Sequence, residues 1–354
     1  MEKERYQNPI RGRGAAQNPP NRFERLRMDY DPGENEGRHP EQPTEYLKDH
    51  THSIIAKNDS PDIPFNKSVN PYRGCEHGCM YCYARPGHEY LGFSPGLDFE
   101  SRIVVKEKAP SLLRAELASP RWEPEPLVMS GVTDPYQPVE RKLELTRQCL
   151  RVMREFMNPV SLITKNHLIT RDIDILEPMA RNKAARAMIS ITTLDRELAG
   201  KMEPRTSQPM RRLEAVKKLS DAGIPVGVMV APIVPGLTDH EVPKLLEAAA
   251  EAGARYAGHT IVRLPHQLKE LFTDWLQKHY PDRKDKVINK LLSLRDGKMN
   301  DSRFGHRFAA RGAYAEQIHQ TMSVYKKRYG FREAPGPLST DHFCGPSRQQ
   351  LSLF

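Results

Sequence analysis

Residues 75–82 of this 354-residue chain read Cys-Glu-His-Gly-Cys-Met-Tyr-Cys and place three thiols in one short loop. Cysteine thiolates are the ligands that hold iron–sulfur clusters in proteins, and a [4Fe–4S] cubane with three protein thiolates keeps one iron open for another molecule. Cys75, Cys79 and Cys82 therefore predict a cluster that takes part in chemistry beyond electron transfer.

A structural zinc ion completed by His77 or His88 is the alternative, because sites of three cysteines and one histidine are tetrahedral and common. Zinc modules usually carry their ligands as two separated pairs. Here the spacing is C-x3-C-x2-C, with the aromatic Tyr81 just before the third cysteine. This spacing favours the cluster.

Six short apolar stretches alternate with amphipathic helical stretches between residues 66 and 263. This alternation is typical of βαβ units and a parallel sheet, and continuous apolar runs suit strands buried on both faces. The predicted strands span 68–70, 127–130, 160–164, 187–193, 225–231 and 258–263.

Helical spacing of apolar residues is clearest at 210–219, where the stretch ends at Gly223, a residue suited to a left-handed helix cap. A second helix is expected to close at Gly253 and a third to span 143–156. A last apolar stripe over 314–329 contains three tyrosines, which we expect to be core residues before base-stacking platforms.

The cysteine spacing, with Tyr81 at the aromatic position, resembles the motif of the radical S-adenosylmethionine (SAM) superfamily. Residues 66–265 resemble its branch of spore photoproduct lyase and DNA repair photolyase-related proteins. The resemblance implies an α/β fold, a partial (β/α)6 TIM-like barrel, which agrees with the six predicted strands. It also implies that SAM binds the open iron, that one electron cleaves its sulfonium, and that a 5′-deoxyadenosyl radical abstracts a substrate hydrogen.

The resemblance extends to cofactor contacts at the ends of the strands, where barrels place their chemistry. A carboxylate needs a cation and hydroxyl donors, and an adenine edge pairs with main-chain groups. For the two hydroxyl residues, ordinary barrel filling is the alternative. The residues that match the family's SAM contacts are Tyr81, Thr133, Lys165, Ser190 and Ala231.

One position departs from the resembling family. Spore photoproduct lyases carry a hydrogen-donating cysteine two residues before the Thr133 position, and this chain has Gly131 there. Reversal of the spore photoproduct therefore does not carry over. Cys344 is a candidate donor if the C-terminal tail folds over the barrel mouth, whereas Cys149 is expected to be a small buried residue in helix 143–156.

Residues 134–138, Asp-Pro-Tyr-Gln-Pro, form a compact turn directly after Thr133. Asp134 and Tyr136 are therefore candidate catalytic residues, and together with Gln137 candidate substrate contacts. A proline-fixed turn with helix-capping polar groups is an equal alternative.

The net charge of +9 is concentrated near the C-terminus, where residues 263–333 hold 16 Lys and Arg against 8 Asp and Glu. A local basic surface follows, and DNA is its expected partner. We predict an extended or partly disordered arm at 1–65, the barrel at 66–265, a basic helical extension at 266–333 and a tail at 334–354.

The last five residues, Gln350–Phe354, read Gln-Leu-Ser-Leu-Phe and resemble the short peptide by which bacterial replication and repair proteins dock on the DNA polymerase sliding clamp. Three apolar anchors and one amide suit such a pocket. The alternative is that Leu353 and Phe354 dock on their own barrel.

No apolar run reaches the roughly 18 residues of a membrane helix, and the N-terminus lacks the apolar stretch of a signal peptide, so a cytoplasmic location and no membrane partner are expected. The predicted function is a radical SAM enzyme that acts on DNA with a lyase or repair activity and takes its electron from a reductant such as flavodoxin or ferredoxin. The alternatives are RNA or protein as substrate, or a noncatalytic iron–sulfur protein associated with DNA.

Overall fold

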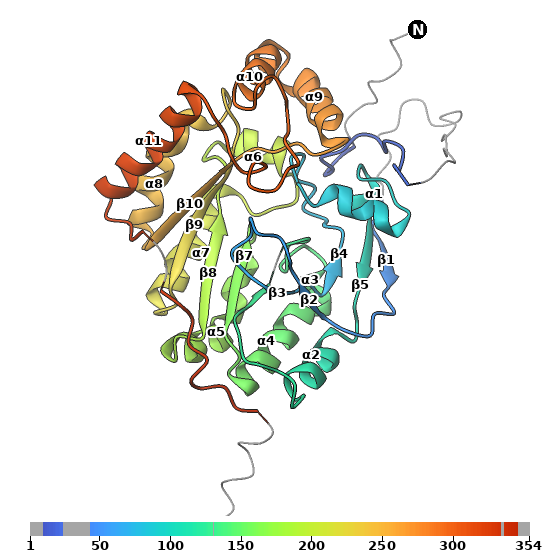
Figure 1. Cartoon of the computed structure of the whole chain (residues 1–354), viewed down its shortest axis with the longest axis vertical. Coiled ribbons are helices and arrows are strands. Elements are labelled where there is room, and N and C mark those ends of the chain that lie inside the picture. The colour runs from blue at the N-terminus through green and yellow to red at the C-terminus, as the bar shows by residue number, and fades with distance from the viewer. Residues whose placement is uncertain (1–9, 24–42, 130, 334–335, 346–354) are drawn as a thin grey trace, which may run out of the picture.

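The computed structural model describes residues 10–23, 43–129, 131–333 and 336–345. Within these ranges the main sheet has seven strands in the order β10-β9-β8-β7-β6-β3-β2 (Figure 1). All neighbouring pairs are parallel except β2 with β3. The strands are β2 Ile55–Lys57, β3 Lys67–Val69, β6 Leu127–Met129, β7 Val160–Thr164, β8 Ala185–Ser190, β9 Val226–Ile233 and β10 Tyr256–Ile261.

The six parallel strands of the described chain confirm the predicted partial (β/α)6 barrel. The bounds of β7 are those predicted, whereas β8 begins two residues earlier and ends three residues earlier than expected. Residues such as Leu162, Ile189 and Val228 are fully buried, as continuous apolar strands covered on both faces require.

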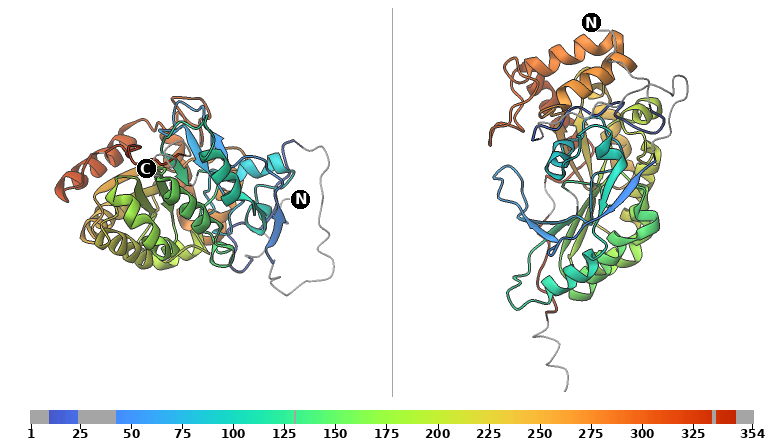
Figure 2. Two further views of the ribbon diagram at one scale, coloured as in Figure 1. Left: turned by 90° about the horizontal axis from the view of Figure 1, so that it is seen from below. Right: turned by 90° about the vertical axis from the view of Figure 1, so that its right-hand side faces the viewer.

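The helices that connect the strands lie on one face of the sheet (Figure 2). Neighbouring helices contact each other in the pairs α2–α4, α4–α5 and α7–α8. Gly223 and Gly253 adopt φ of 73° and 94° just after α7 and α8, as the predicted caps require. The helices are α2 Ala109–Leu117, α3 Glu140–Leu143, α4 Leu145–Phe156, α5 Ile173–Arg181, α6 Arg196–Met202, α7 Pro209–Asp221 and α8 Val242–Glu251, with 3-10 helices η2 His167–Asp172 and η3 Asp239–Glu241.

A second sheet was not predicted. Its three strands within the described residues are β1 Glu45–Lys48, β5 Arg102–Val105 and β4 Tyr72–Arg73, in the order β1-β5-β4. β1 lies in a segment without strand periodicity, because three of its four residues are exposed and no side chain is fully buried. The short helix α1 Asp98–Ser101 precedes β5, and β4 leads directly into the loop at 74–82.

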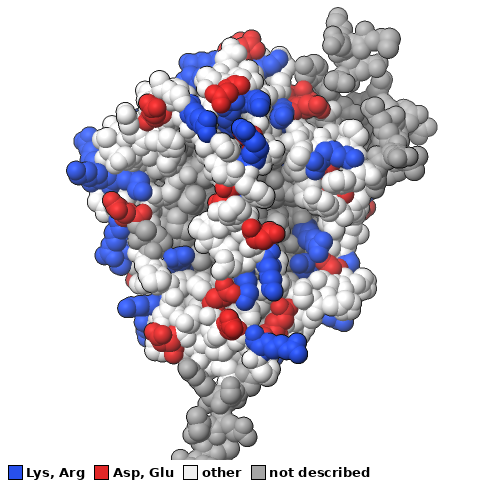
Figure 3. Space-filling model, viewed as in Figure 1, with Lys and Arg blue, Asp and Glu red and all other residues white. Residues whose placement is uncertain are grey.

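Three helices follow the last strand of the barrel: α9 Leu268–His279, α10 Pro281–Ser293 and α11 Ala313–Arg328. α9 packs on α10, and α11 packs on α8. The tyrosines of α11 are half-buried against the core. Lys and Arg side chains gather over α10 and its surroundings, with acidic side chains among them (Figure 3). No helix in the described ranges is both long and apolar enough to cross a membrane.

Two segments far apart in the sequence join near the open side of the sheet, and we call them the latch: residues 60–62 after β2 and residues 303–307 after α10. Arg307 Nε lies 2.7 Å from the Asp62 carboxylate, and the Gly305 N–H donates to the same carboxylate at 2.8 Å. Arg307 also donates to the Ser60 hydroxyl. The latch therefore connects the β2 side of the sheet to the segment that follows β10.

Candidate functional site

The loop at 74–82 carries the three predicted cluster ligands and is fixed by backbone hydrogen bonds to neighbouring elements. The Cys75 N–H donates to the Phe99 carbonyl at 2.8 Å, and the Met80 N–H donates to the Met202 carbonyl at 3.1 Å. These bonds tie one half of the loop to α1 and the other half to the end of α6. We call residues 74–82 the cluster loop.

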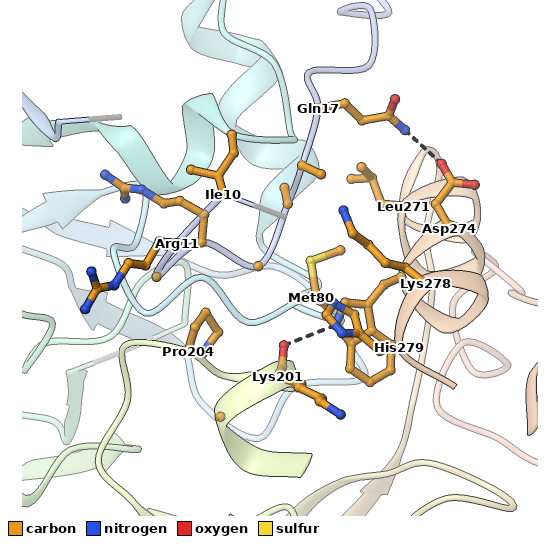
Figure 4. Close-up of a pocket in the computed structure, with 17 residues that line it drawn as sticks. Ile10, Arg11, Gln17, Met80, Lys201, Pro204, Leu271, Asp274, Lys278 and His279 are labelled. Atoms are coloured by element: carbon orange, nitrogen blue, oxygen red, sulfur yellow. Dashed lines mark hydrogen bonds between the residues drawn. The ribbon is translucent and has the colours of Figure 1, made fainter. Parts of the chain in front are cut away.

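Residues 10–17, here called the N-terminal strap, cover one side of the cluster loop. A Cβ on Gly14 would lie 1.9 Å from the Gly78 carbonyl oxygen, so only glycine permits this approach. The buried Glu100 carboxylate accepts two strap N–H groups, each at 2.8 Å. The strap, Met80 and α9 line a cavity of about 220 Å3 beside the loop (Figure 4).

The donor chemistry of the cluster loop fits an iron–sulfur cluster. Cys75 and Cys79 are buried, and Cys82 is half-buried. Burial raises the pKa of the Cys82 thiol and Cys75 raises it further, while Arg85 and Lys165 act in the opposite direction and favour the thiolate. Thiolates are the form that binds iron, and three of them are the donor set expected for a cubane with one open iron.

Of the two histidines of the zinc alternative, His77 interacts with the Cys75 thiol and with Asp134. His77 Nδ1 lies 3.4 Å from the Asp134 carboxylate, and its Nε2 lies 3.2 Å from the Asn166 amide nitrogen. His88 packs against the Phe93 ring, with centroids 5.2 Å apart. The choice of a cluster over zinc therefore rests on the C-x3-C-x2-C spacing of the loop.

The residues that match SAM contacts come together at the carboxyl edge of the sheet. Thr133 follows β6, Lys165 directly follows β7, and Ser190 ends β8. Ala231 lies two residues beyond Met229, which pairs with Ser190 in the sheet register. Parallel neighbours place these four positions beside each other.

Lys165 faces the cluster loop, with its ammonium 5.8 Å from the centroid of the Tyr81 ring. Burial would lower the pKa of Lys165, but the Cys79 thiol and the Glu203 carboxylate outweigh it and raise the pKa above its ordinary value. The ammonium form of the side chain is therefore favoured. The Thr133 hydroxyl donates to the Gly74 carbonyl at 2.6 Å and so holds the start of the loop.

A buried ion pair that sequence reasoning missed supports Tyr81. Glu203, just after α6, accepts the Tyr81 hydroxyl and pairs with Arg212 of α7. Arg212 also donates to the Ser190 carbonyl at 3.0 Å. The sequence contains a signal for the burial of Arg212. Arg212 lies four residues before Val216, on the same buried face of the helix.

The candidate substrate contacts at 134–137 point into the protein. Asp134 accepts the Thr164 hydroxyl at 2.6 Å and the Lys165 N–H at 2.9 Å. Tyr136 is fully buried. Gln137 accepts the Glu76 N–H at 2.9 Å within the cluster loop. As placed, these side chains orient the loop and the strand end, and their contact with substrate stays a prediction.

The structure does not bring Cys344 to the barrel mouth. Its N–H donates to the carbonyl of Phe156, the last residue of α4, at the amino edge of the sheet. The cluster loop lies at the opposite edge (Figure 1). The fold that would make Cys344 a hydrogen donor is therefore not observed. Cys149 is fully buried, as expected, and the clamp-like segment Gln350–Phe354 lies outside the described residues.

Tyr83, which sequence reasoning also missed, follows the last cysteine and reaches the departing position. Its hydroxyl donates to the Gly131 carbonyl at 2.8 Å, and the residue is 54% exposed. A Cβ at Gly131 would have Phe65 as its nearest neighbour at 3.9 Å, although the φ of 121° favours glycine. An exposed phenol therefore stands beside the cluster loop.

Comparisons with solved structures show the fold. Spore photoproduct lyase complexed with dinucleoside spore photoproduct superposes with a TM-score of 0.55 over 81% of this chain and 80% of that chain, at 18% sequence identity. This likeness agrees with the mostly parallel α/β barrel described above.

Sequence comparisons show the family. An uncharacterised protein of Mycobacterium tuberculosis H37Rv is 37% identical over 224 residues, which are 62% of this chain and 65% of that protein. A radical SAM Nalpha-GlyT isomerase of Pseudomonas phage M6 is 23% identical over 272 residues, or 76% of this chain and 55% of the relative. The chain thus spans about two thirds or less of these relatives. Residues 69–249, just over half of the chain, match the model of the radical SAM superfamily. Membership in this superfamily implies a [4Fe–4S] cluster and SAM as cofactors. The chain belongs to the radical SAM superfamily.

Proposed function

We propose that this radical SAM enzyme abstracts a hydrogen atom from DNA in a repair-like or modifying reaction. The proposal is carried by the arrangement of the barrel mouth, the carboxyl edge of the parallel strands. The cluster loop and Lys165 lie at this edge, and the basic segment 263–333 begins where the last strand ends at the same edge. The shared fold with a lyase solved with a dinucleoside photoproduct supports a nucleic-acid substrate by analogy.

Each residue of the site would have a separate role at the barrel mouth. Cys75, Cys79 and Cys82 would hold the cluster, the Lys165 ammonium would pair with the carboxylate of SAM, and the main chain at Ala231 would meet its adenine. When bound, cluster and SAM together supply a 5′-deoxyadenosyl radical that removes a hydrogen atom from a substrate.

The first experiment tests the chemistry. Anaerobic reduction of the reconstituted protein with SAM should yield 5′-deoxyadenosine, which a noncatalytic iron–sulfur protein would not release. Cys79→Ala should abolish the product, because the cubane loses one of three thiolates. Cys344→Ala is the matched control, since Cys344 lies at the opposite edge of the sheet, and it should keep full activity. Wild-type protein that carries its cluster but forms no 5′-deoxyadenosine would refute catalysis.

The second experiment tests the substrate. Deuterium should move from labelled DNA into 5′-deoxyadenosine, and damaged and undamaged strands should be compared. RNA and protein candidates run in parallel as the alternatives. Transfer from labelled RNA or protein, with none from DNA, would replace DNA as the substrate while leaving the chemistry in place.

A further inference from the structure

Arg295 is a buried cation with unused hydrogen-bond donors. Its side chain is almost fully enclosed, at 5% exposure, and one nitrogen donates to the Val262 carbonyl at 2.9 Å. Its Nε and Nη1 have no hydrogen-bond partner among the described residues. Buried charged donors are nearly always paired in native proteins, because leaving one unpaired is costly. The site therefore lacks an acceptor.

Arg263 stands beside Arg295, two residues beyond the end of β10. Its guanidinium carbon lies 5.6 Å from the centroid of the Tyr83 ring and 4.1 Å from the centroid of the Phe308 ring. Stacking uses the faces of the guanidinium plane and leaves its N–H edges free for bidentate binding of an oxyanion. Within the described residues, Arg263 is held by these ring contacts and its side chain makes no hydrogen bond or ion pair.

The nearby carboxylates do not neutralise this pair. Asp62 is bound by the latch through Arg307, and Asp301 pairs with Arg303 at 2.6 Å. Burial lowers the pKa of Arg295 and the Arg263 guanidinium lowers it further, against the opposing effect of Asp301. Adjacent cations that repel each other in a partly buried site favour an anion between them.

We propose that Arg263 and Arg295 together hold one backbone phosphate of a DNA strand at the barrel mouth. The inference rests on the proposed function, because it names the place where the enzyme would bind the backbone of its DNA substrate. Phe304 and Phe308, 62% and 41% exposed, offer faces on which bases next to the phosphate stack. Tyr83 links the phosphate site to Cys82, so the bound nucleotide lies beside the cluster loop.

Binding of a fluorescent single-stranded oligonucleotide, measured by anisotropy over a range of salt concentrations, tests the site. Arg263→Gln should weaken binding about tenfold and reduce the slope of log affinity against log salt by about one. Arg154→Gln in the last turn of α4 is the control, because Arg154 is exposed, lies outside the basic segment 263–333 and loses the same charge. Arg295→Lys keeps the charge but loses the free donors, and should also weaken binding. If Arg295→Lys fails to fold, Arg263→Gln decides alone.

A second measurement identifies the occupant. Single uncharged methylphosphonate linkages, placed in turn along the oligonucleotide, should weaken wild-type binding at one position and have no further effect there in Arg263→Gln. Inorganic phosphate should compete only at concentrations far above those of the strand. Inorganic phosphate that binds as tightly as the strand, and is lost in Arg263→Gln, would make the occupant a small anion and overturn the proposal.

Failure of the inference and failure of the proposed function give different results. If wild type binds DNA and transfers deuterium, but Arg263→Gln matches Arg154→Gln in affinity and salt slope, the phosphate site is refuted and the function stands. If wild type neither binds DNA nor takes deuterium from it, the proposed substrate fails, and the phosphate site for DNA fails with it.

Discussion

Gly14 determines whether the N-terminal strap can lie on the cluster loop. A methyl group there would meet the backbone oxygen of Gly78, which cannot rotate away, so Gly14→Ala should displace the strap. We expect a destabilisation of about 1–3 kcal/mol and faster proteolysis within residues 10–17. Gly87→Ala, where a Cβ meets nothing within 4 Å, is the control. Equal proteolysis rates for the two variants would show that the contact is not needed.

His88 gives the stability of the protein a pH dependence. Burial lowers the pKa of His88 to about 4, against a partial opposing effect of Asp98. The folded-state pKa lies below the unfolded value of 6.5, so between about pH 6.5 and 4 the unfolded chain takes up a proton that the folded chain does not. Stability from this group is therefore present above pH 6.5 and is lost as the pH falls.

The test compares wild type with His88→Leu by denaturant unfolding at several pH values. Wild type should lose stability by on the order of 2–3 kcal/mol more than the variant between pH 6.5 and 4. The difference measured at pH 8, where histidine is neutral in both states, is the baseline. A difference that does not change with pH would contradict the buried neutral histidine.

Among individual residues, the sequence indicated those that lie at strand ends. It missed those whose surroundings depend on tertiary packing. Thr133, Lys165 and Ser190 were expected from the resemblance to the family, whose cofactor contacts lie at the strand ends where a barrel places its chemistry. Tyr83 and Arg295 carried no such signal. Their surroundings come from segments far apart in the sequence, and an arginine in a basic stretch looks like a surface residue until its burial is known.

The ends of α6 and α7 depend on the Glu203–Arg212 ion pair. Removal of one partner leaves a buried charge, so Arg212→Met should cost about 3–5 kcal/mol of unfolding free energy. Adding Glu203→Gln to that variant should recover part of the loss, because the carboxylate that lost Arg212 is then neutral. Denaturant unfolding of both single variants and the double variant measures the coupling. Losses that simply add would show that the two charges do not interact.

Among the strands, the buried ones could be predicted from the sequence, whereas the short or exposed ones could not. The six barrel strands were predicted because burial on both faces leaves a continuous apolar run. β1 and β4 were not, since β1 is largely exposed and β4 has only two residues. Both strands form by pairing with β5, a partner that local sequence cannot reveal.

For the whole molecule, the clamp-like end Gln350–Phe354 and the division of the chain at residues 65, 265 and 333 stay predictions. Deletion of 350–354 should abolish binding to a purified DNA polymerase sliding clamp, because the apolar anchors are lost. The truncated protein should still form 5′-deoxyadenosine. Surface plasmon resonance with immobilised clamp gives the affinities, and the same affinity for the full-length and truncated proteins would refute the segment's role.

The latch has a consequence for the order in which the protein assembles. Asp62 and Gly305 are 243 residues apart in the sequence, so their contact closes a very large loop. The conformational entropy lost on closing this loop is offset only after the intervening sheet has formed. Contacts that form after the transition state affect mainly the unfolding rate. Asp62→Asn should therefore speed unfolding in stopped-flow experiments and leave the refolding rate nearly unchanged; slower refolding would place the latch in the nucleus. The mouth would then be the last region to close during folding and the first to open.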